Sequence, residues 1–274
     1  MIFKSVAGVI VIIASAAVMT GQAAIMNAPS QAAKAGFTKL VVNEEFRHFN
    51  LQNRNLGNPA GDSTAWRQYP FLTWPLSYER IAVSNGVLTL TTQPGSHHGL
   101  ATMITTMAAP PGDSKPDGPQ NDFRFGYFEA RLRFDPNPNN APAFWLESVV
   151  PVKLYPNYRG NDAARYCEID IIELNWLRPG TYMGTVHDWR AGVDTINSNH
   201  IIQPPHGTNL ADWNTFGLLW QPGRVSWYMN NKLVSTATTG SICDNDRLSM
   251  VLSASKERGE EDQKLEVNWV HVYQ

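Results

Sequence analysis

Charge clusters, basic runs and cysteine are scarce in this chain. Only 17% of its 274 residues are charged, and 22 Lys and Arg nearly balance 24 Asp and Glu. No run rich in Lys or Arg occurs, so a nucleic-acid partner has no support. The chain also lacks glycine loops that cradle phosphates, the H-E-x-x-H zinc motif and the G-x-S-x-G nucleophile turn. These absences exclude the usual signatures of nucleotide-binding enzymes, zinc proteases and serine hydrolases.

Segments with the period of an amphipathic helix are almost absent after residue 37. Short apolar runs separated by turn residues occur instead, at a spacing typical of strands. For example, Asn85-Gly86 separates 81–83 from the alternating run 87–91, which predicts a hairpin. About a dozen such runs predict an all-β protein that folds as a sandwich or a barrel.

Long apolar runs are confined to the N-terminus. Lys4 precedes the apolar stretch 6–19, and small residues follow it, which predicts a secretory signal peptide over 1–24. A membrane anchor is the alternative, although the run is short for a bilayer span. We expect 25–37 to be a flexible lead and 38–274 to be one catalytic domain. The mature protein is then expected to be secreted, extracellular or periplasmic, without a membrane partner, and a monomer.

The chain contains only two cysteines, Cys167 and Cys243. An exported protein can pair them in a disulfide. Alternatively, Cys167 is a buried free thiol, because its strand position directs it into a core, away from the neighbouring Glu168. The sequence leaves both alternatives open.

Three carboxylates lie within the six residues 168–173, which read Glu-Ile-Asp-Ile-Ile-Glu. On a strand, Glu168 and Asp170 point to the same face, whereas strict alternation sends Glu173 to the opposite face. A one-residue bulge at 171–172 would return Glu173 to the face of the other two. Without a bulge one carboxylate faces a core, which is costly.

Closely spaced carboxylates suit hydrolysis of a glycosidic bond. The reaction needs one ionised carboxylate at the anomeric carbon and one protonated acid at the leaving oxygen. The alternative is a solvent-facing strand that is acidic without any catalytic role. The isoleucines between the acids and the aromatic residues on both sides disfavour that alternative.

Several segments together resemble glycoside hydrolase family 16. The hexapeptide 168–173 is similar to its E-[IL]-D-x-x-E signature, in the six-residue version with a bulge found in laminarinases, agarases and carrageenases. Further segments resemble other strands of the family in the family's order, over about 38–274: 125–131 (FGYFEAR), 143–146 (AFWL), 184–187 (GTVH), 214–220 (NTFGLLW), 225–228 (VSWY) and 267–273 (VNWVHVY).

The resemblance implies a jelly-roll β-sandwich, concanavalin A-like, with an open substrate cleft on the concave sheet. It implies a retaining endo-hydrolase of β-1,3 or β-1,4 linkages in a polysaccharide partner, with a β-glucan preferred. By motif position Glu168 would be the nucleophile, Asp170 the assisting acid and Glu173 the acid/base, with His187 supporting them. Three tryptophans are candidates for stacking on sugars: Trp145, Trp176 and Trp189.

Three other points follow from the resemblance. No cofactor and no catalytic metal are expected. Many relatives bind a structural calcium through an Asp in the closing strand, where this chain has Asn268, so a calcium ion is disfavoured but left open. A hydrolase of marine galactans of the agar or carrageenan type, a transglycosylase, and a non-catalytic lectin-like sandwich are the alternatives.

Overall fold

The computed structural model describes residues 27–47, 66–68, 78–93, 101–107, 122–150, 157, 159–174, 177–195, 198–256, 259 and 261–274. The predicted signal peptide, 1–24, lies outside these residues. Within them, no helix is long and apolar enough to cross a membrane.

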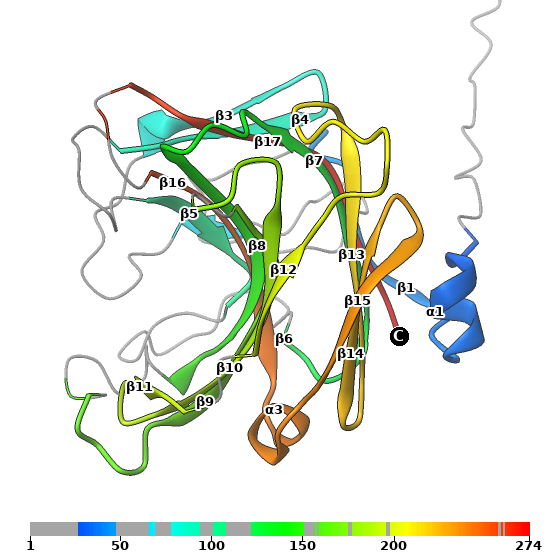
Figure 1. The fold of residues 1–274 in the computed structure, drawn as a ribbon, viewed down its shortest axis with the longest axis vertical. Coiled ribbons are helices and arrows are strands. Elements are labelled where there is room, and N and C mark those ends of the chain that lie inside the picture. Colours follow the sequence, from blue (N-terminus) through cyan, green and yellow to red (C-terminus); the bar gives the residue numbers. More distant parts are fainter. Residues whose placement is uncertain are drawn as a thin grey trace, which may run out of the picture.

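Two antiparallel sheets stack face to face (Figure 1). The eight-stranded outer sheet runs in the order β15 (Lys232–Thr238), β14 (Arg224–Met229), β13 (Asn214–Gln221), β7 (Gly126–Phe134), β17 (Lys264–Tyr273), β4 (Val87–Thr91) and β3 (Ile81–Ser84), and β1 (Leu40–Glu44) also pairs with β17. The nine-stranded site sheet runs in the order β11 (Val193–Asp194), β10 (Tyr182–Arg190), β9 (Arg165–Leu174), β8 (Asn140–Ser148), β16 (Leu248–Lys256), β5 (Thr102–Thr105) and β2 (Arg67–Gln68). In that sheet β12 (Ser198–Ile202) also pairs with β10, and β6 (Asp122–Phe123) with β16.

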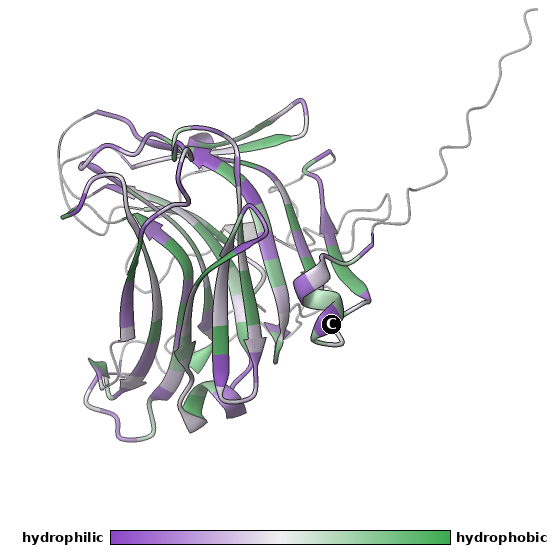
Figure 2. Cartoon of the chain, turned by 45° about the vertical axis from the view of Figure 1, so that its right-hand side comes forward, coloured by the Kyte–Doolittle hydropathy of each residue, from purple (hydrophilic) through white to green (hydrophobic). Residues whose placement is uncertain are grey.

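The core lies between the two sheets, because each strand directs every second side chain inward. Phe144 and Leu146 of β8 and Ile169 of β9 meet Leu218 and Trp220 of β13 there, and all five are fully buried. Each buried side chain of this kind contributes roughly 1.5–3 kcal/mol. Figure 2 shows the resulting alternation of hydrophobic and hydrophilic residues along the strands. The predicted all-β sandwich is therefore confirmed.

The predicted hairpin at Asn85-Gly86 is also confirmed. Ser84 pairs with Val87, and both turn residues have positive φ, 52° for Asn85 and 71° for Gly86. Two successive positive φ angles are the requirement of a type I′ turn, which asparagine and glycine meet at low cost.

Part of the lead differs from the expectation for 25–37. Ser30–Lys34 forms helix α1, which packs on the outward face of the outer sheet. Ala32 is fully buried there against Tyr127, and Gln31 Nε2 donates to Tyr127 Oη at 2.7 Å. The small polar residues suggested a flexible segment, but small side chains also allow a helix to lie close against a sheet.

Candidate active site

The acidic strand β9 carries the predicted bulge. Asp170 pairs with Trp145 of β8, and Glu173 pairs with Ala143, so Ile171 is the extra residue on this side. Trp145 and Ala143 are two residues apart and therefore point to one face of the sheet. Asp170 and Glu173 consequently share that face, although they are three residues apart.

The second neighbour of β9 gives the same result. On β10, Met183 pairs with Glu173 and Thr185 pairs with Asp170, with a register shift between them. Met183 and Thr185 are again two residues apart. The bulge prediction is confirmed, and Gly184 is the residue opposite the extra length of β9.

A residue of the outer sheet contacts the bulge from the core side. Trp227 of β14 donates its Nε1 hydrogen to the carbonyl oxygen of Asp170 at 2.8 Å, across the core. A β-carbon at position 184 would lie 2.6 Å from the Trp227 ring, so only glycine leaves room for this contact. A bulge locally disrupts the ladder of backbone hydrogen bonds, and the indole satisfies one carbonyl there.

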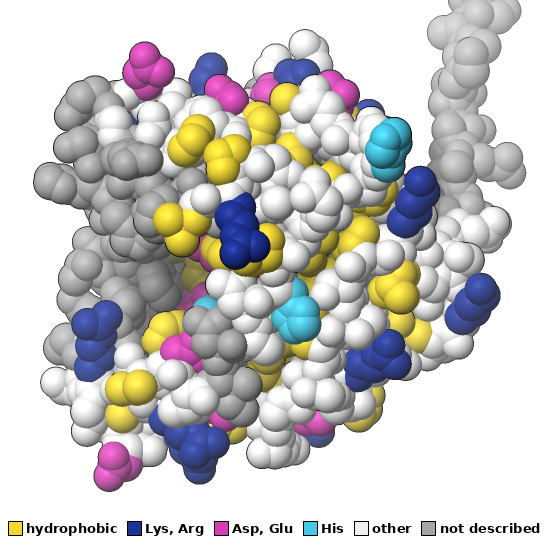
Figure 3. Space-filling view, viewed as in Figure 1, with side chains coloured by type: hydrophobic (Ala, Val, Ile, Leu, Met, Phe, Trp, Pro, Cys, Tyr) yellow, Lys and Arg dark blue, Asp and Glu magenta, His cyan; other side chains and the backbone are white. Residues whose placement is uncertain are grey.

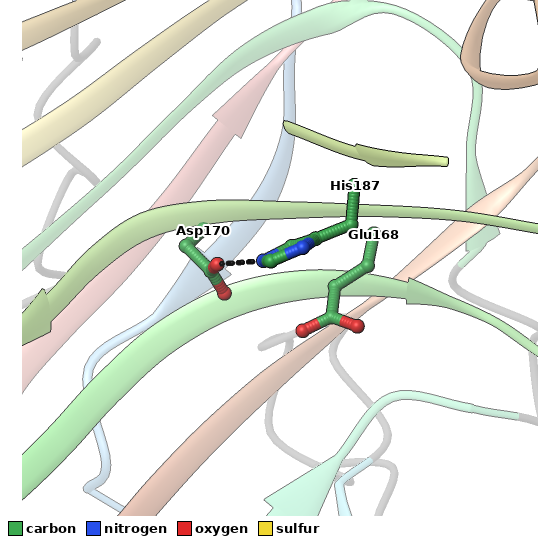
Figure 4. Close-up of side chains that lie close together, drawn as sticks. All are labelled: Glu168, Asp170 and His187. Atoms are coloured by element: carbon green, nitrogen blue, oxygen red, sulfur yellow. Dashed lines mark hydrogen bonds and ion pairs between the residues drawn. The ribbon is translucent and has the colours of Figure 1, made fainter. Parts of the chain in front are cut away.

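His187 joins two carboxylates on the outward face of the site sheet, which is its concave face (Figure 1). Figure 4 shows the contact with Asp170. Its Nε2 lies 3.0 Å from Asp170 Oδ2, and its Nδ1 lies 2.8 Å from Asp194 Oδ2. Burial alone would lower the pKa of His187, but the hydrogen bonds and charges of Asp170, Glu168 and Asp194 together outweigh it and raise the pKa to about 10. The ring is therefore an imidazolium near neutral pH and donates from both nitrogens.

Glu168 lies opposite His187 and is half-buried. Trp189 Nε1 donates to Glu168 Oε2 at 2.7 Å. Burial and then the charge of Asp170 raise the pKa of Glu168 to about 7, whereas the His187 charge and the Trp189 hydrogen bond oppose the rise. Glu168 therefore titrates close to neutral pH, and its ionised form depends on these two partners.

Glu168, Asp170 and His187 also have the spacing of a metal site, since one ligand atom of each lies within 4.8 Å of the others. A metal needs a free nitrogen lone pair on the imidazole. Both ring nitrogens of His187 already face carboxylate oxygens. Hydrogen bonding accounts for the cluster.

Acidic groups dominate this part of the concave face. In the strands β16, β8, β9 and β10, residues facing outward include Glu147, Glu168, Asp170, Glu173 and His187. Figure 3 shows acidic side chains and a histidine at the recess in the left half of the view. The three Lys and Arg residues of these four strands lie at positions that point to the opposite face of the sheet: Arg165, Arg190 and Lys256.

Trp145, one of the three predicted stacking tryptophans, has contacts within the protein. Trp145 lies on the concave face but is only 7% exposed, packs against Met103 and donates to Ser253 Oγ at 3.2 Å. It therefore offers little surface to a sugar. Trp176 lies outside the described residues.

Trp189, the third predicted stacking residue, is half-buried and has contacts within the protein. Its ring stacks on Tyr166, with centroids 5.9 Å apart, and on His187, with centroids 5.5 Å apart. Its N–H holds Glu168. The structure thus makes Trp189 a hydrogen-bond donor to the predicted nucleophile.

Two acidic residues near the site were missed from the sequence. Asp194 follows His187 by seven residues and reaches it because β11 folds back on β10. No local pattern shows that pairing. Glu147, in contrast, is two residues after Trp145, so strand alternation alone could have placed it on the same face.

The question left open for the cysteines is settled, because Cys167 and Cys243 form a disulfide. Cys167 is fully buried on the core side of β9, directly before Glu168, as its position on the strand predicted. Cys243 lies in helix α3 (Ser241–Asn245), and the nearby Asp246 Oδ2 accepts the Cys167 backbone N–H at 3.2 Å. Two links therefore hold the strand beside Glu168.

The groups around Asn268 do not suit a calcium ion. Asn268 Nδ2 donates to the Gly86 carbonyl at 3.2 Å, and Asn268 Oδ1 accepts from Arg131 at 2.9 Å. Calcium requires several free oxygen ligands. Here hydrogen-bond donors, one of them a cationic guanidinium, already occupy the oxygens.

Comparisons with known proteins agree with this fold. A family model described as "Glycosyl hydrolases family 16" matches residues 101–270. An endo-1,3-1,4-beta-glycanase of Rhizobium meliloti is 25% identical over 194 residues, which are 66% of this chain and 35% of that protein. A kappa-carrageenase of Pseudoalteromonas carrageenovora is 25% identical over 249 residues, 78% of this chain and 54% of that protein.

Among solved structures, the laminarinase catalytic domain of Thermotoga maritima superposes with a TM-score of 0.61 at 16% identity. The match covers 86% of this chain and 98% of that domain. It shows that the two proteins share a β-sandwich fold. The chain spans between about a third and about half of the length of the two curated relatives.

Proposed function

Because this chain belongs to the glycosyl hydrolases of family 16, we propose that it is an endo-acting hydrolase of β-linked polysaccharides. The observation that carries the proposal is the bulge of β9, which brings Glu168, Asp170 and Glu173 onto one face. A retaining glycosidase needs two carboxyl groups beside the same bond, one ionised and one protonated. A lectin does not need such a set, so the acidic trio supports hydrolysis over the lectin-like alternative.

The proposed mechanism is double displacement. Glu173 protonates the glycosidic oxygen while Glu168 attacks the anomeric carbon, which forms a covalent glycosyl-enzyme and releases the leaving sugar. Glu173 then takes a proton from water, and that water breaks the bond to Glu168. The imidazolium of His187 and the N–H of Trp189 favour the carboxylate form of Glu168. Asp170 orients His187 through its hydrogen bond.

We propose a neutral β-glucan as the substrate. The four strands around the site place no Lys or Arg side chain on the concave face, because their Lys and Arg residues lie at positions that point to the opposite face. These strands therefore offer no Lys or Arg partner for the sulfate or carboxylate groups of an anionic chain. The galactan alternative has the kappa-carrageenase likeness in its favour, since that match covers 78% of this chain against 66% for the beta-glycanase, although both relatives are 25% identical.

Export is part of the proposal. The predicted signal peptide over 1–24 supports it, and so does the disulfide, because disulfides persist in oxidising compartments. We further propose that the mature protein acts as a secreted monomer without cofactor, nucleic acid or membrane partner. N-terminal sequencing of the protein recovered from the medium or periplasm should find a start near residue 25, and retention of residue 1 would contradict cleavage.

The central experiment compares Glu168→Gln and Glu173→Gln with the exposed control Glu261→Gln. Each of the first two changes should abolish release of reducing ends, while far-ultraviolet circular dichroism and binding of glucan oligosaccharides stay near normal. The control should keep full activity. Substantial turnover by either site variant would overturn the assignment, whereas Glu168→Gly with azide should yield a glycosyl azide of inverted configuration.

Analysis of the products formed from a panel of polysaccharides tests the proposed substrate. We expect short oligosaccharides from laminarin or mixed-linkage glucan, and little from agarose, carrageenan or porphyran. Preferential cleavage of a sulfated galactan would replace the glucan proposal. Products longer than the substrate would identify a transglycosylase that uses the same residues.

A further inference from the structure

Glu147 of β8 is a buried acid that the proposed mechanism does not use. It is the cross-strand partner of Glu168 on one side and of Ser249 on the other, and all three side chains point to the concave face. Glu147 is 1% exposed and Ser249 is 0% exposed. Directly opposed residues of antiparallel strands have their β-carbons about 4.5–5.5 Å apart, so the two glutamates are close neighbours.

Neither carboxyl oxygen of Glu147 has a hydrogen-bond partner within the described structure, and the Oγ of Ser249 has none either. The situation of Glu168 differs, because Trp189 donates to it and His187 lies opposite. The two glutamates thus form a pair in which one member has partners for a negative charge and the other has none.

The charged groups around Glu147 are acids. Glu168 and Asp170 face it from β9, and Asp246 approaches from the segment before β16. From β16 itself the facing residue is the uncharged Ser249. Arg247, which precedes β16, points away to solvent and pairs with Asp122. Among the described residues no counterion faces Glu147, and burying an ionised carboxylate without one costs several kcal/mol.

We propose that Glu147 is the proton-holding member of a carboxyl pair with Glu168, so that the pair carries one negative charge and that charge stays on Glu168. Glu147 is then a positioning residue, and its neutral form keeps a second charge away from the nucleophile. A second charge there would raise the pKa of Glu168 and remove its ionised form at neutral pH. Burial and the neighbouring carboxylates raise the pKa of Glu147 well above its ordinary value, which agrees. The proposal rests on the proposed function only for the role of Glu168.

Infrared spectroscopy tests the proton directly, without any need for activity. At pH 7 the difference spectrum between the wild-type protein and Glu147→Gln should contain the carbonyl band of one protonated carboxylic acid. The matched control Glu261→Gln should instead show loss of an ionised carboxylate. A difference spectrum for Glu147→Gln that resembles the control would overturn the proposal. If this variant does not fold, Glu147→Met removes the same proton.

The pH dependence of stability gives a second readout. The raised folded-state pKa means that the native protein binds one proton more than the unfolded chain above about pH 4.5, so stability falls as pH rises toward that pKa. Glu147→Gln removes this proton. The Tm of the variant minus the Tm of the wild type should therefore increase progressively from about pH 5 to pH 8. A difference in Tm that is constant over this range would contradict the proposal.

The pH profile of kcat/KM connects the pair to the reaction. Glutamine imitates a neutral acid, so the acid limb of Glu147→Gln should stay within about 0.3 pH unit of the wild-type limb. If Glu147 were ionised in the wild-type enzyme, its removal would shift that limb to lower pH by about one unit. An infrared acid band in a protein without hydrolysis would refute the proposed function alone. Hydrolysis without the band would refute the Glu147 proposal alone.

Discussion

At the scale of single residues, the ionisation of Glu168 depends on the positive charge of one histidine, His187. His187 binds Asp170 and Asp194 through its two nitrogens and lies opposite Glu168. Its pKa of about 10 keeps it positive while Glu168, with a pKa of about 7, titrates. The histidine therefore increases the ionised fraction of Glu168 at a given pH, against the effects of burial and Asp170.

The substitution His187→Gln should move the activity profile to higher pH. Loss of the positive charge removes an interaction that lowers the pKa of Glu168, so that pKa rises above about 7. The acid limb of kcat/KM should shift upward by about one unit, which is about tenfold lower activity at pH 6. The measurement is the pH profile with laminarin oligosaccharides. An equal loss at every pH would indicate a structural role instead.

Trp189→Phe isolates the indole hydrogen bond from the stacking. Phenylalanine keeps a ring against Tyr166 but removes the N–H that holds Glu168 Oε2. A hydrogen bond to a charged group is worth about 1.5–3 kcal/mol, so kcat/KM should fall by about tenfold to a hundredfold. Oligosaccharide affinity, measured by calorimetry in a Glu173→Gln background, should stay nearly unchanged. A large loss of affinity there would support the sugar-stacking prediction for Trp189.

At the scale of elements, β9 serves the core with one face and the site with the other. Ile169, Ile171 and Ile172 are buried in the core, and the bulge returns Glu173 to the face of Glu168. The disulfide from Cys167 to Cys243 ties this strand to α3. The strand is thereby fixed immediately beside the predicted nucleophile.

Cys243→Ser should lower stability more than it lowers intrinsic chemistry. The disulfide spans 76 residues of sequence, and closing a loop of that size stabilises a fold by about 2–4 kcal/mol. Urea unfolding should show that loss, and the wild-type protein under reductant should match the variant. The control Ser241→Ala, in the same helix, should unfold like the wild type. Equal midpoints for Cys243→Ser and the wild type would contradict the expected stabilisation.

At the scale of the whole molecule, the acidic site and helix α1 lie on opposite outward faces of the sandwich. The site sheet turns its acids away from the core, whereas Tyr127 of the outer sheet packs against helix α1. Figure 1 shows α1 beside the outer sheet. Gln31 of α1 donates to Tyr127 Oη and to Asn231 Oδ1. The helix therefore stabilises the sandwich without touching the site.

Gln31→Ala should separate stability from activity. Loss of the two hydrogen bonds should cost about 1–2 kcal/mol of unfolding free energy, read from urea denaturation. The kcat and KM on glucan should not change, because the core separates α1 from β9. The control Lys34→Ala, an exposed position of the same helix, should have little effect on either quantity. A fall in kcat for Gln31→Ala would reveal coupling between the two faces.

The sequence by itself determined most of the strands, although not β11 and β12, together with the hairpin at Asn85-Gly86 and the need for a bulge between Asp170 and Glu173. These features follow from local rules, because side-chain direction on a strand alternates and a charge is excluded from a core. The same rules placed Cys167 behind Glu168.

Only the tertiary structure decided which groups act on the carboxylates. Asp194, the Trp189 N–H, Glu147 and the partner of Cys167 all come to β9 from other segments of the chain, through strand register and a turn that no local pattern specifies. Packing likewise turned part of the expected flexible lead into α1. Six consecutive residues identify the acids. Their pKa values depend on burial and nearby charges, and only the tertiary structure brings those neighbours to β9.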